Sequence, residues 1–249
     1  MNPHYISLFL AYTTAAVCWF LFNTFIVKDL WNKTINFTPK KPYLEFIFAL
    51  ITVVIILAIG QLYSNDLLIP NNSSNNFVDG LNQFLIFCPT LGLILLRKQS
   101  LETVWLPKNN IPLRLLIGLS LAFIALVVYW LSRKNALPFS DILSNIFHLK
   151  NFSHLVQVFM EDITIALIFA RLAKWIGFKW SIGLVAFLFA VGHIPSMINN
   201  GYSIEEMSSL IFDTGIGVVI LTAVSKSKDV WWFFIIHFVL DMTQYYGSI

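Results

Sequence analysis

Eight long apolar segments constrain the fold of this chain more than any other feature of its sequence. A helix of roughly 20 apolar residues crosses a hydrocarbon core of about 30 Å. Apolar residues make up 57% of the chain and charged residues 12%, against roughly 25% charged residues in typical soluble domains. We therefore expect an all-α fold, a polytopic membrane helix bundle with about eight transmembrane helices, over residues 5–27, 42–63, 77–96, 112–131, 154–172, 178–198, 206–224 and 230–246.

Lys and Arg are distributed unevenly over the loops between these segments. Thirteen of the 16 lie in or beside the loops after the first, third, fifth and seventh segments. The opposite side carries only Arg133, Lys134 and Lys150. The positive-inside rule then predicts that both termini lie outside. Because the basic residues are spread over short loops, they form no patch of the kind that binds nucleic acid, and we expect no nucleic-acid partner.

The sequence indicates one integral membrane domain, residues 1–249, because no linker is long enough to separate two domains. Residues 1–135 would hold the first four helices, which carry few charges at membrane depth and are expected to enclose the rest. Residues 154–246 would hold the working core, helices five to eight. Between these parts, residues 139–148 mix apolar and polar side chains as a short interfacial helix does.

Five ionisable residues inside the predicted spans of the second half are the candidate site residues. A charge near the bilayer centre costs about 2.5–3.5 kcal/mol on insertion scales. The chain must gain something from these side chains, since each one opposes insertion. Either they satisfy one another in a buried cluster or they perform chemistry in a hydrated pocket. The five residues are Glu161, Asp162, His193, His237 and Asp241.

The spacing of these residues limits how they can face one another. Glu161 and Asp162 are adjacent and differ by about 100° around a helix, so they cannot both point at one spot. His237 and Asp241 are four residues apart, so we expect their side chains to meet on one helix face, where the carboxylate would fix the imidazole tautomer. A structural hydrogen bond between helices is the alternative for this pair, and an interfacial position is the alternative for His193.

Taken in order, the motifs resemble the CPBP family of intramembrane proteases, also called the Abi or CAAX protease family. That family has a Glu-Glu-x-x-x-Arg motif, then Phe-x-x-x-His, then His-x-x-x-Asn or Asp. This chain has Glu161 followed by Asp162, then FAVGH ending at His193, then HFVLD from His237 to Asp241. The resemblance covers residues 159–244. It departs from the family at the motif arginine, where this chain has Ala166.

The resemblance implies an intramembrane endopeptidase that works by a glutamate-activated water. Glu161 would be the general base and His193 would help to hold the water. His237 and Asp241 would polarise the scissile carbonyl and stabilise the oxyanion, with Asp162 in support. The implied setting is the cell membrane, as a multi-pass protein, with the lipid bilayer and a hydrophobic or leader-bearing peptide as partners. No cofactor is implied.

Other functions stay open at this stage. Two histidines and two carboxylates could bind zinc, but the chain has no His-Glu-x-x-His motif, so metal-free catalysis is favoured. The absence of the motif arginine favours a catalytically impaired relative that serves as a bacteriocin immunity protein or as a peptide-binding or export accessory. A proton-relay transporter is less favoured, because the two halves show no matching broken segments.

Overall fold

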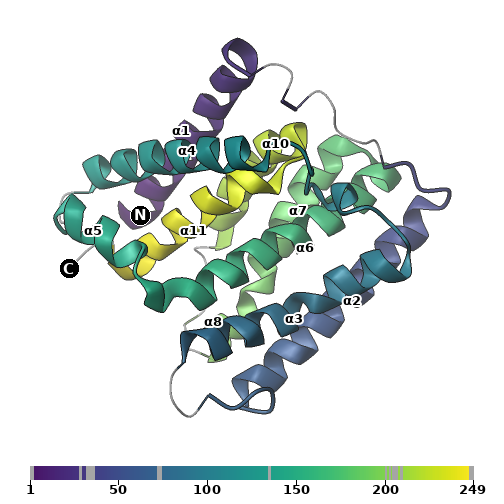
Figure 1. Cartoon of the computed structure of the whole chain (residues 1–249). Helices are drawn as coiled ribbons and strands as arrows, with labels where there is room; N and C mark the ends of the chain where they lie inside the picture. The colour runs from purple at the N-terminus through teal and green to yellow at the C-terminus, as the bar shows by residue number, and fades with distance from the viewer. Residues whose placement is uncertain are drawn as a thin grey trace.

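The computed structural model describes residues 3–27, 30–31, 37–71, 75–133, 136–199, 201, 203, 207 and 210–246. These residues form helices and loops, with no strand among them (Figure 1), so the all-α fold class is confirmed. Two short 3-10 helices, η1 (Leu101–Val104) and η2 (Leu149–Asn151), accompany the α-helices. The α-helices are α1 (Pro3–Phe25), α2 (Pro42–Ser64), α3 (Asn76–Leu96), α4 (Ile111–Ser132), α5 (Phe139–Ile146), α6 (Phe152–Ile176), α7 (Phe178–Gly192), α8 (Ile194–Asn199), α10 (Leu210–Ser227) and α11 (Val230–Tyr246).

Five of these helices, α1, α2, α3, α4 and α10, are long and apolar enough to cross a membrane. Three further helices coincide with predicted spans. Of these, α7 has 15 residues and α11 has 17, and Glu161, Asp162 and Arg171 interrupt the apolar character of α6. The count of eight spans and the placement of both termini outside therefore stay predictions.

Two predicted spans differ in detail from the structure. The segment 178–198 is interrupted, because α7 ends at Gly192 and α8 begins at Ile194. Pro195 is the second residue of α8, where a missing backbone N–H costs the helix nothing. In the segment 206–224, residues 206, 208 and 209 lie outside the described residues. The same holds for Lys28, Lys33 and Lys134, three of the residues on which the predicted orientation rests.

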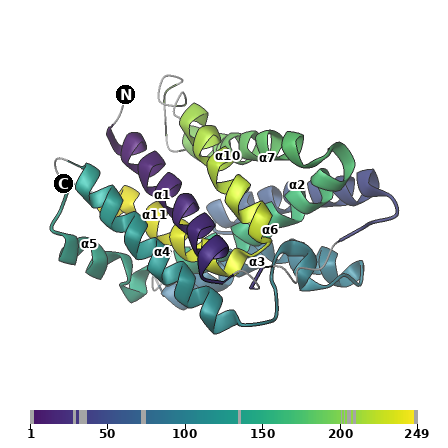
Figure 2. The ribbon, with the colours of Figure 1, turned by 90° about the horizontal axis from the view of Figure 1, so that it is seen from above.

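α11 lies at the centre of the bundle, packed against α4 on one side and α6 on the other. α1 lies against α4 and α10, and α7 packs against α10 and α6 (Figure 2). α2 and α3 form a pair that covers the side of α6 away from α11. α11 thus lies between α4 and α6, and α5 and α1 also contact it.

The contact between α4 and α11 depends on a glycine. A Cβ atom on Gly118 would lie 2.6 Å from the carbonyl oxygen and 2.9 Å from the Cα atom of Trp232. Both neighbours are backbone atoms of α11 and cannot move independently of that helix. Small residues let helix backbones approach closely in membranes, where packing and hydrogen bonds replace the hydrophobic effect as the force between helices.

Replacing Gly118 with alanine should therefore separate α4 from α11. We expect Gly118→Ala to destabilise the protein by about 1–3 kcal/mol, the usual range for overpacking a tight interface. The matched control is Gly92→Ala in α3, where an added Cβ atom would meet nothing within 4 Å. Thermal unfolding in detergent should show a lower midpoint for Gly118→Ala only. Equal midpoints for the two variants would contradict the close contact.

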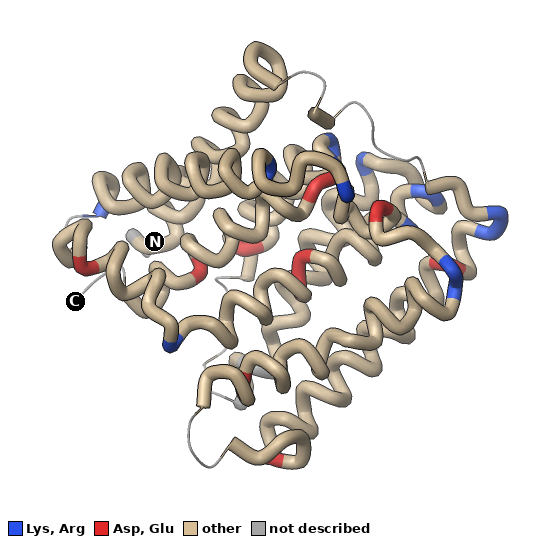
Figure 3. The backbone as a smooth tube through the Cα atoms, viewed as in Figure 1, with Lys and Arg blue, Asp and Glu red and all other residues tan. Residues whose placement is uncertain are grey.

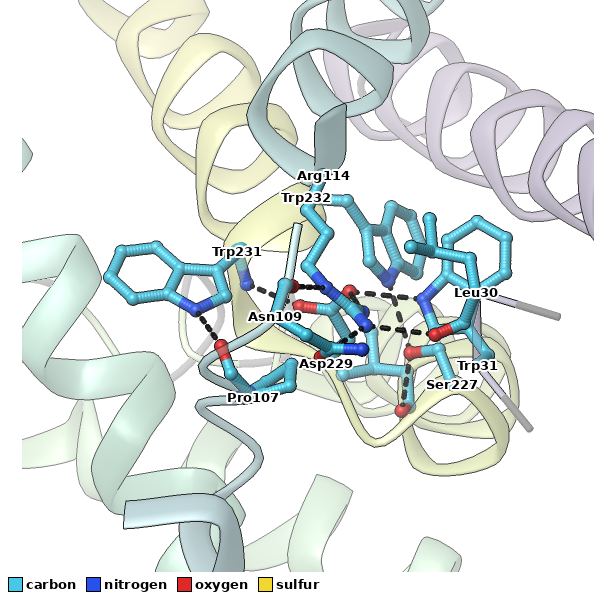
Figure 4. A network of polar contacts seen from close by, with 10 residues as sticks. Leu30, Trp31, Pro107, Asn109, Arg114, Ser227, Asp229, Trp231 and Trp232 are labelled. Atoms are coloured by element: carbon cyan, nitrogen blue, oxygen red, sulfur yellow. Dashed lines mark hydrogen bonds and ion pairs between the residues drawn. The ribbon is translucent and has the colours of Figure 1, made fainter. Parts of the chain in front are cut away.

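A buried ion pair fixes the start of α11 (Figure 4). The side chains of Arg114 and Asp229 are 1% and 0% exposed, and Nη1 of Arg114 donates to Oδ2 of Asp229. The indole Nε1 of Trp31 donates to the same oxygen over 3.0 Å. The guanidinium also donates to the carbonyl of Leu30 at 2.8 Å and to the side chain of Asn109 at 3.1 Å. The network thus joins two loops to the first turn of α4.

Asp229 also caps α11. Its Oδ1 accepts the backbone N–H of Trp231 at 2.9 Å, the usual bond from an N-cap carboxylate to the second helical residue. The Nε1 atom of Trp231 donates to the carbonyl of Pro107 at 3.0 Å, and that of Trp232 donates to the hydroxyl of Ser227 at 3.0 Å (Figure 4). These bonds set both the position and the rotation of α11 about its axis.

Asp229→Ala should leave the Arg114 guanidinium buried without its counter-ion. Breaking a buried pair in this way costs about 3–5 kcal/mol, because the remaining charge is uncompensated. Asp141→Ala is a suitable control, since Asp141 is an exposed aspartate on α5. A detergent melting experiment should show a large loss for Asp229→Ala and a small one for Asp141→Ala. Similar small losses would mean that the network contributes little to stability.

Candidate active site

A cavity of about 380 Å³ lies among α1, α6, α7, α10 and α11. Apolar side chains such as Leu8, Ile165 and Ile216 form part of its wall. Most described Lys and Arg lie near the edges of the bundle, whereas several Asp and Glu lie inside it (Figure 3). All five site residues predicted from the sequence line this cavity, namely Glu161, Asp162, His193, His237 and Asp241.

Two hydrogen bonds between histidines and carboxylates join α6 to α11 in the cavity wall. Nδ1 of His237 lies 2.9 Å from Oδ1 of Asp162. Nε2 of His154 lies 2.5 Å from Oδ2 of Asp241. The other carboxylate oxygen of Asp241, Oδ1, accepts a hydrogen bond from the side-chain amide of Gln244, also on α11, at 2.7 Å. In each of the two histidine–carboxylate bonds one partner comes from α6 and the other from α11, so both bonds also hold the two helices together.

The expected contact between His237 and Asp241 is therefore replaced by contacts across the helix interface. The two residues do lie four apart on α11 and line the same cavity. However, His237 bonds to Asp162 and Asp241 bonds to His154, and both partners lie on α6, which packs directly against α11. Asp162, and not Asp241, thus orients the imidazole of His237.

The two adjacent acids have different surroundings. Asp162 is 3% exposed, and its Oδ2 atom has no hydrogen-bond partner among the described residues. Glu161 is half-buried, lines the cavity and makes no hydrogen bond to a described residue. A carboxylate that lines a cavity with no hydrogen-bonded partner is available to accept a proton from a bound molecule.

His193 lies at the break between α7 and α8 and is exposed at the mouth of the cavity. Its Nδ1 lies 2.9 Å from the carbonyl oxygen of Phe189, and its ring packs edge-on against the Phe189 ring at 4.7 Å. Because a carbonyl oxygen only accepts, Nδ1 must carry the hydrogen. In the neutral ring Nε2 then has a lone pair that can accept a hydrogen bond from water.

His237 is held by aromatic rings as well as by Asp162. The Phe233 ring stacks on its imidazole with a centroid separation of 5.6 Å and an interplanar angle of 24°. The ring of Phe189 meets it edge-on at 6.2 Å. With Nδ1 engaged by Asp162, Nε2 is the nitrogen left to interact with a bound molecule.

Three further aspartate and histidine residues line the cavity, namely His4, His154 and Asp213. Asp213 lies near the start of α10. His154 was not predicted, although it lies seven residues before Glu161, a spacing of two turns that places both on one helix face. His4 was not predicted either, since nothing in the sequence links α1 to the motifs. Its Nδ1 lies 2.8 Å from the hydroxyl of Tyr129.

Ala166 occupies the position at which the family has its motif arginine. Ala166 is 0% exposed and packs in the apolar core. Arg171, one and a half turns further along α6, does not line the cavity. Its Nη1 donates to the carbonyl of Thr103 at 3.0 Å, Nη2 donates to Gln99, and the guanidinium lies 4.7 Å from the centre of the Phe37 ring. Arg171 therefore does not replace the missing cation beside the acidic pair.

The candidate site has no arrangement typical of a metal centre within the described part of the chain. There, no group of three or more His, Cys, Asp and Glu side chains is placed to hold a metal ion. The histidines instead form hydrogen bonds to carboxylates or to a backbone carbonyl.

Comparison with known families agrees with this geometry. Residues 144–243 match the family model described as "Type II CAAX prenyl endopeptidase Rce1-like". The model is one of the CPBP family, so the resemblance seen in the motifs is confirmed over this segment. The match includes all five predicted site residues and supports an intramembrane endopeptidase function. Together with the apolar helices it indicates a multi-pass membrane protein. No curated protein and no solved structure matches the chain.

If water fills the cavity, a cysteine placed in its wall should react with a soluble thiol reagent. The test uses a background in which Cys18 and Cys88 are replaced by serine. Gln157→Cys, in the cavity wall, should be modified quickly, because the reactive thiolate forms in water. Val54→Cys is the control, since Val54 is 64% exposed on the outside of α2, in the span that lipid would surround. Equal labelling at both positions in vesicles would contradict a hydrated cavity.

Proposed function

We propose that this chain is a CPBP-like intramembrane endopeptidase that cleaves a membrane-associated or hydrophobic peptide with a water molecule activated by Glu161. One observation carries the proposal: Glu161 on α6, His193 just after the end of α7 and His237 on α11 line one cavity. The apolar part of the cavity wall suits a hydrophobic peptide. The proposed location is the cell membrane, and the proposed mechanism uses no cofactor.

The first step is activation of water. Glu161 accepts one hydrogen of the water, and Nε2 of His193 accepts the other. Two acceptors leave the lone pairs of the water oxygen directed toward the substrate. The proton moves to Glu161 as the oxygen attacks the scissile carbonyl carbon, so a C–O bond forms and the carbonyl oxygen becomes an oxyanion.

The second step is collapse of the tetrahedral intermediate. His237 faces the substrate through Nε2, and the doubly protonated ring donates Nε2–H to the oxyanion. Asp162 keeps the ring in place through its bond to Nδ1. The C–N bond then breaks, and the proton held by Glu161 passes to the leaving amine. The products are a carboxylic acid and an amine, and the base is regenerated.

The exchange of the motif arginine for Ala166 supports a second candidate function. A relative without this cation could bind a hydrophobic peptide and not cleave it, as a bacteriocin immunity protein or as an export accessory. The position of Arg171, turned toward Gln99 and Thr103, favours this alternative, because no arginine adjoins the acidic pair. Both candidates use the same cavity and differ in whether bond cleavage follows binding.

Glu161→Gln should abolish cleavage while leaving peptide binding in place. Loss of a general base lowers kcat by roughly 10²–10⁴-fold. Suitable substrates are a prenylated C-terminal CAAX peptide and a hydrophobic leader-bearing peptide, with products identified by mass spectrometry. Glu102→Gln, on η1 outside the cavity, is the matched control. Activity should also survive a zinc chelator.

Two outcomes would separate the candidates. If the wild-type protein binds a peptide but cleaves none, and Glu161→Gln binds equally well, the accessory function is supported. If cleavage is present and Glu161→Gln retains it, the proposed role of Glu161 is wrong.

A further inference from the structure

The carboxylate of Asp241 raises a chemical problem for the proposed function. Asp241 lines the same cavity as His237, one helical turn away. The family pattern has Asn or Asp at this position, and an Asn amide can donate to an oxyanion. An ionised Asp cannot donate, and its charge would repel the oxyanion that forms on the substrate. Something must offset this charge if Asp241 adjoins the scissile carbonyl.

His154 is placed to do so. Its Nε2 atom lies 2.5 Å from Oδ2 of Asp241, while Gln244 donates to Oδ1. The side chains of His154 and Asp241 are 19% and 26% exposed, so their bond is only partly accessible to water. A hydrogen bond to a charged group is among the stronger ones in proteins, and a low local dielectric strengthens it further. Each oxygen of Asp241 therefore has its own donor.

The surroundings hold the His154 ring in this position. Its centroid lies 6.2 Å from that of Phe238 on α11 and 6.2 Å from that of Tyr245. Glu161 lies two turns further along the same helix and also lines the cavity. If the bond between His154 and Asp241 served only to link α6 to α11, the two residues would not need to line the cavity. Asp241 would also not need the second hydrogen bond from Gln244.

We propose that His154 is a positioning residue of the active site, which acts through Asp241 by donating Nε2–H to the carboxylate and so offsets its charge beside the scissile carbonyl. This inference rests on the proposed function. The residue is separate from the three family motifs, because it precedes Glu161 by seven positions.

The proposal predicts that removal of the Asp241 charge compensates for loss of His154. We expect His154→Ala to lower kcat by about 10–100-fold, the equivalent of one hydrogen bond to a charged group, with KM changed by less than about threefold. His154→Gln should lose less, because its amide can donate. Adding Asp241→Asn to His154→Ala should raise kcat by at least about tenfold over His154→Ala alone, because no anion then needs a donor.

His148→Ala is the matched control, since His148 is an exposed histidine outside the cavity wall. It should keep wild-type kcat. Melting temperatures of all variants separate loss of folding from loss of catalysis. If His154→Ala does not fold, the same comparison is made between His154→Gln and His154→Gln with Asp241→Asn.

Three results would overturn the proposal. One is a double variant that cleaves no faster than the His154 single variant. Another is His154→Ala with wild-type kcat, or His148→Ala with an equal loss. In all three cases cleavage that depends on Glu161 persists, so the proposed function stands without this inference. If the wild-type protein cleaves no substrate, the proposed function fails first and the role of His154 falls with it.

Discussion

The buried ion pair between Arg114 and Asp229 is the interaction on which the rest of the bundle depends. Within a membrane, water is not available to satisfy a polar group, so each buried charge needs partners inside the protein. Here the partners come from two loops, from α4 and from the first turn of α11. Because Asp229 also caps α11, the pair determines where that helix starts. His237 and Asp241 follow two and three turns later, so their depth in the bundle depends on this ion pair.

The interface between α6 and α11 orients the side chains of the candidate site. Its two hydrogen bonds pair Asp162 with His237 and His154 with Asp241. The two adjacent acids on α6 therefore point in different directions. Asp162 is buried and bonds to α11, while Glu161 faces the cavity. The same bonds stabilise the packing and set the positions of His237 and Asp241, two of the proposed site residues. Stability and chemistry are therefore difficult to separate at this interface, which is why the proposed experiments pair each site variant with a control outside the cavity.

Much of the fold could be predicted from sequence, because apolar length and helix periodicity are local properties. The short helix predicted in 139–148 appears as α5 (Phe139–Ile146), and the long helices appear near their predicted ranges except for the break after Gly192. The partner of His237 could not be predicted in this way. Spacing on α11 suggested Asp241, whereas the partner is set by how α6 packs against α11, which no single segment encodes. His4 and His154 were missed for the same reason, although the two-turn spacing between His154 and Glu161 was a signal that could have been used.

The rings around His237 have a consequence for how such a site would bind its substrate. Asp162 holds Nδ1 of the imidazole, the Phe233 ring stacks on its face, and the Phe189 ring meets it in a T-shaped contact. The ring has therefore lost most of its rotational entropy during folding, before any peptide arrives. Binding energy from the peptide need not be spent on ordering this group and remains available for aligning the scissile bond. The preorganisation of the proposed site would then depend partly on phenylalanine side chains that carry no reactive atom.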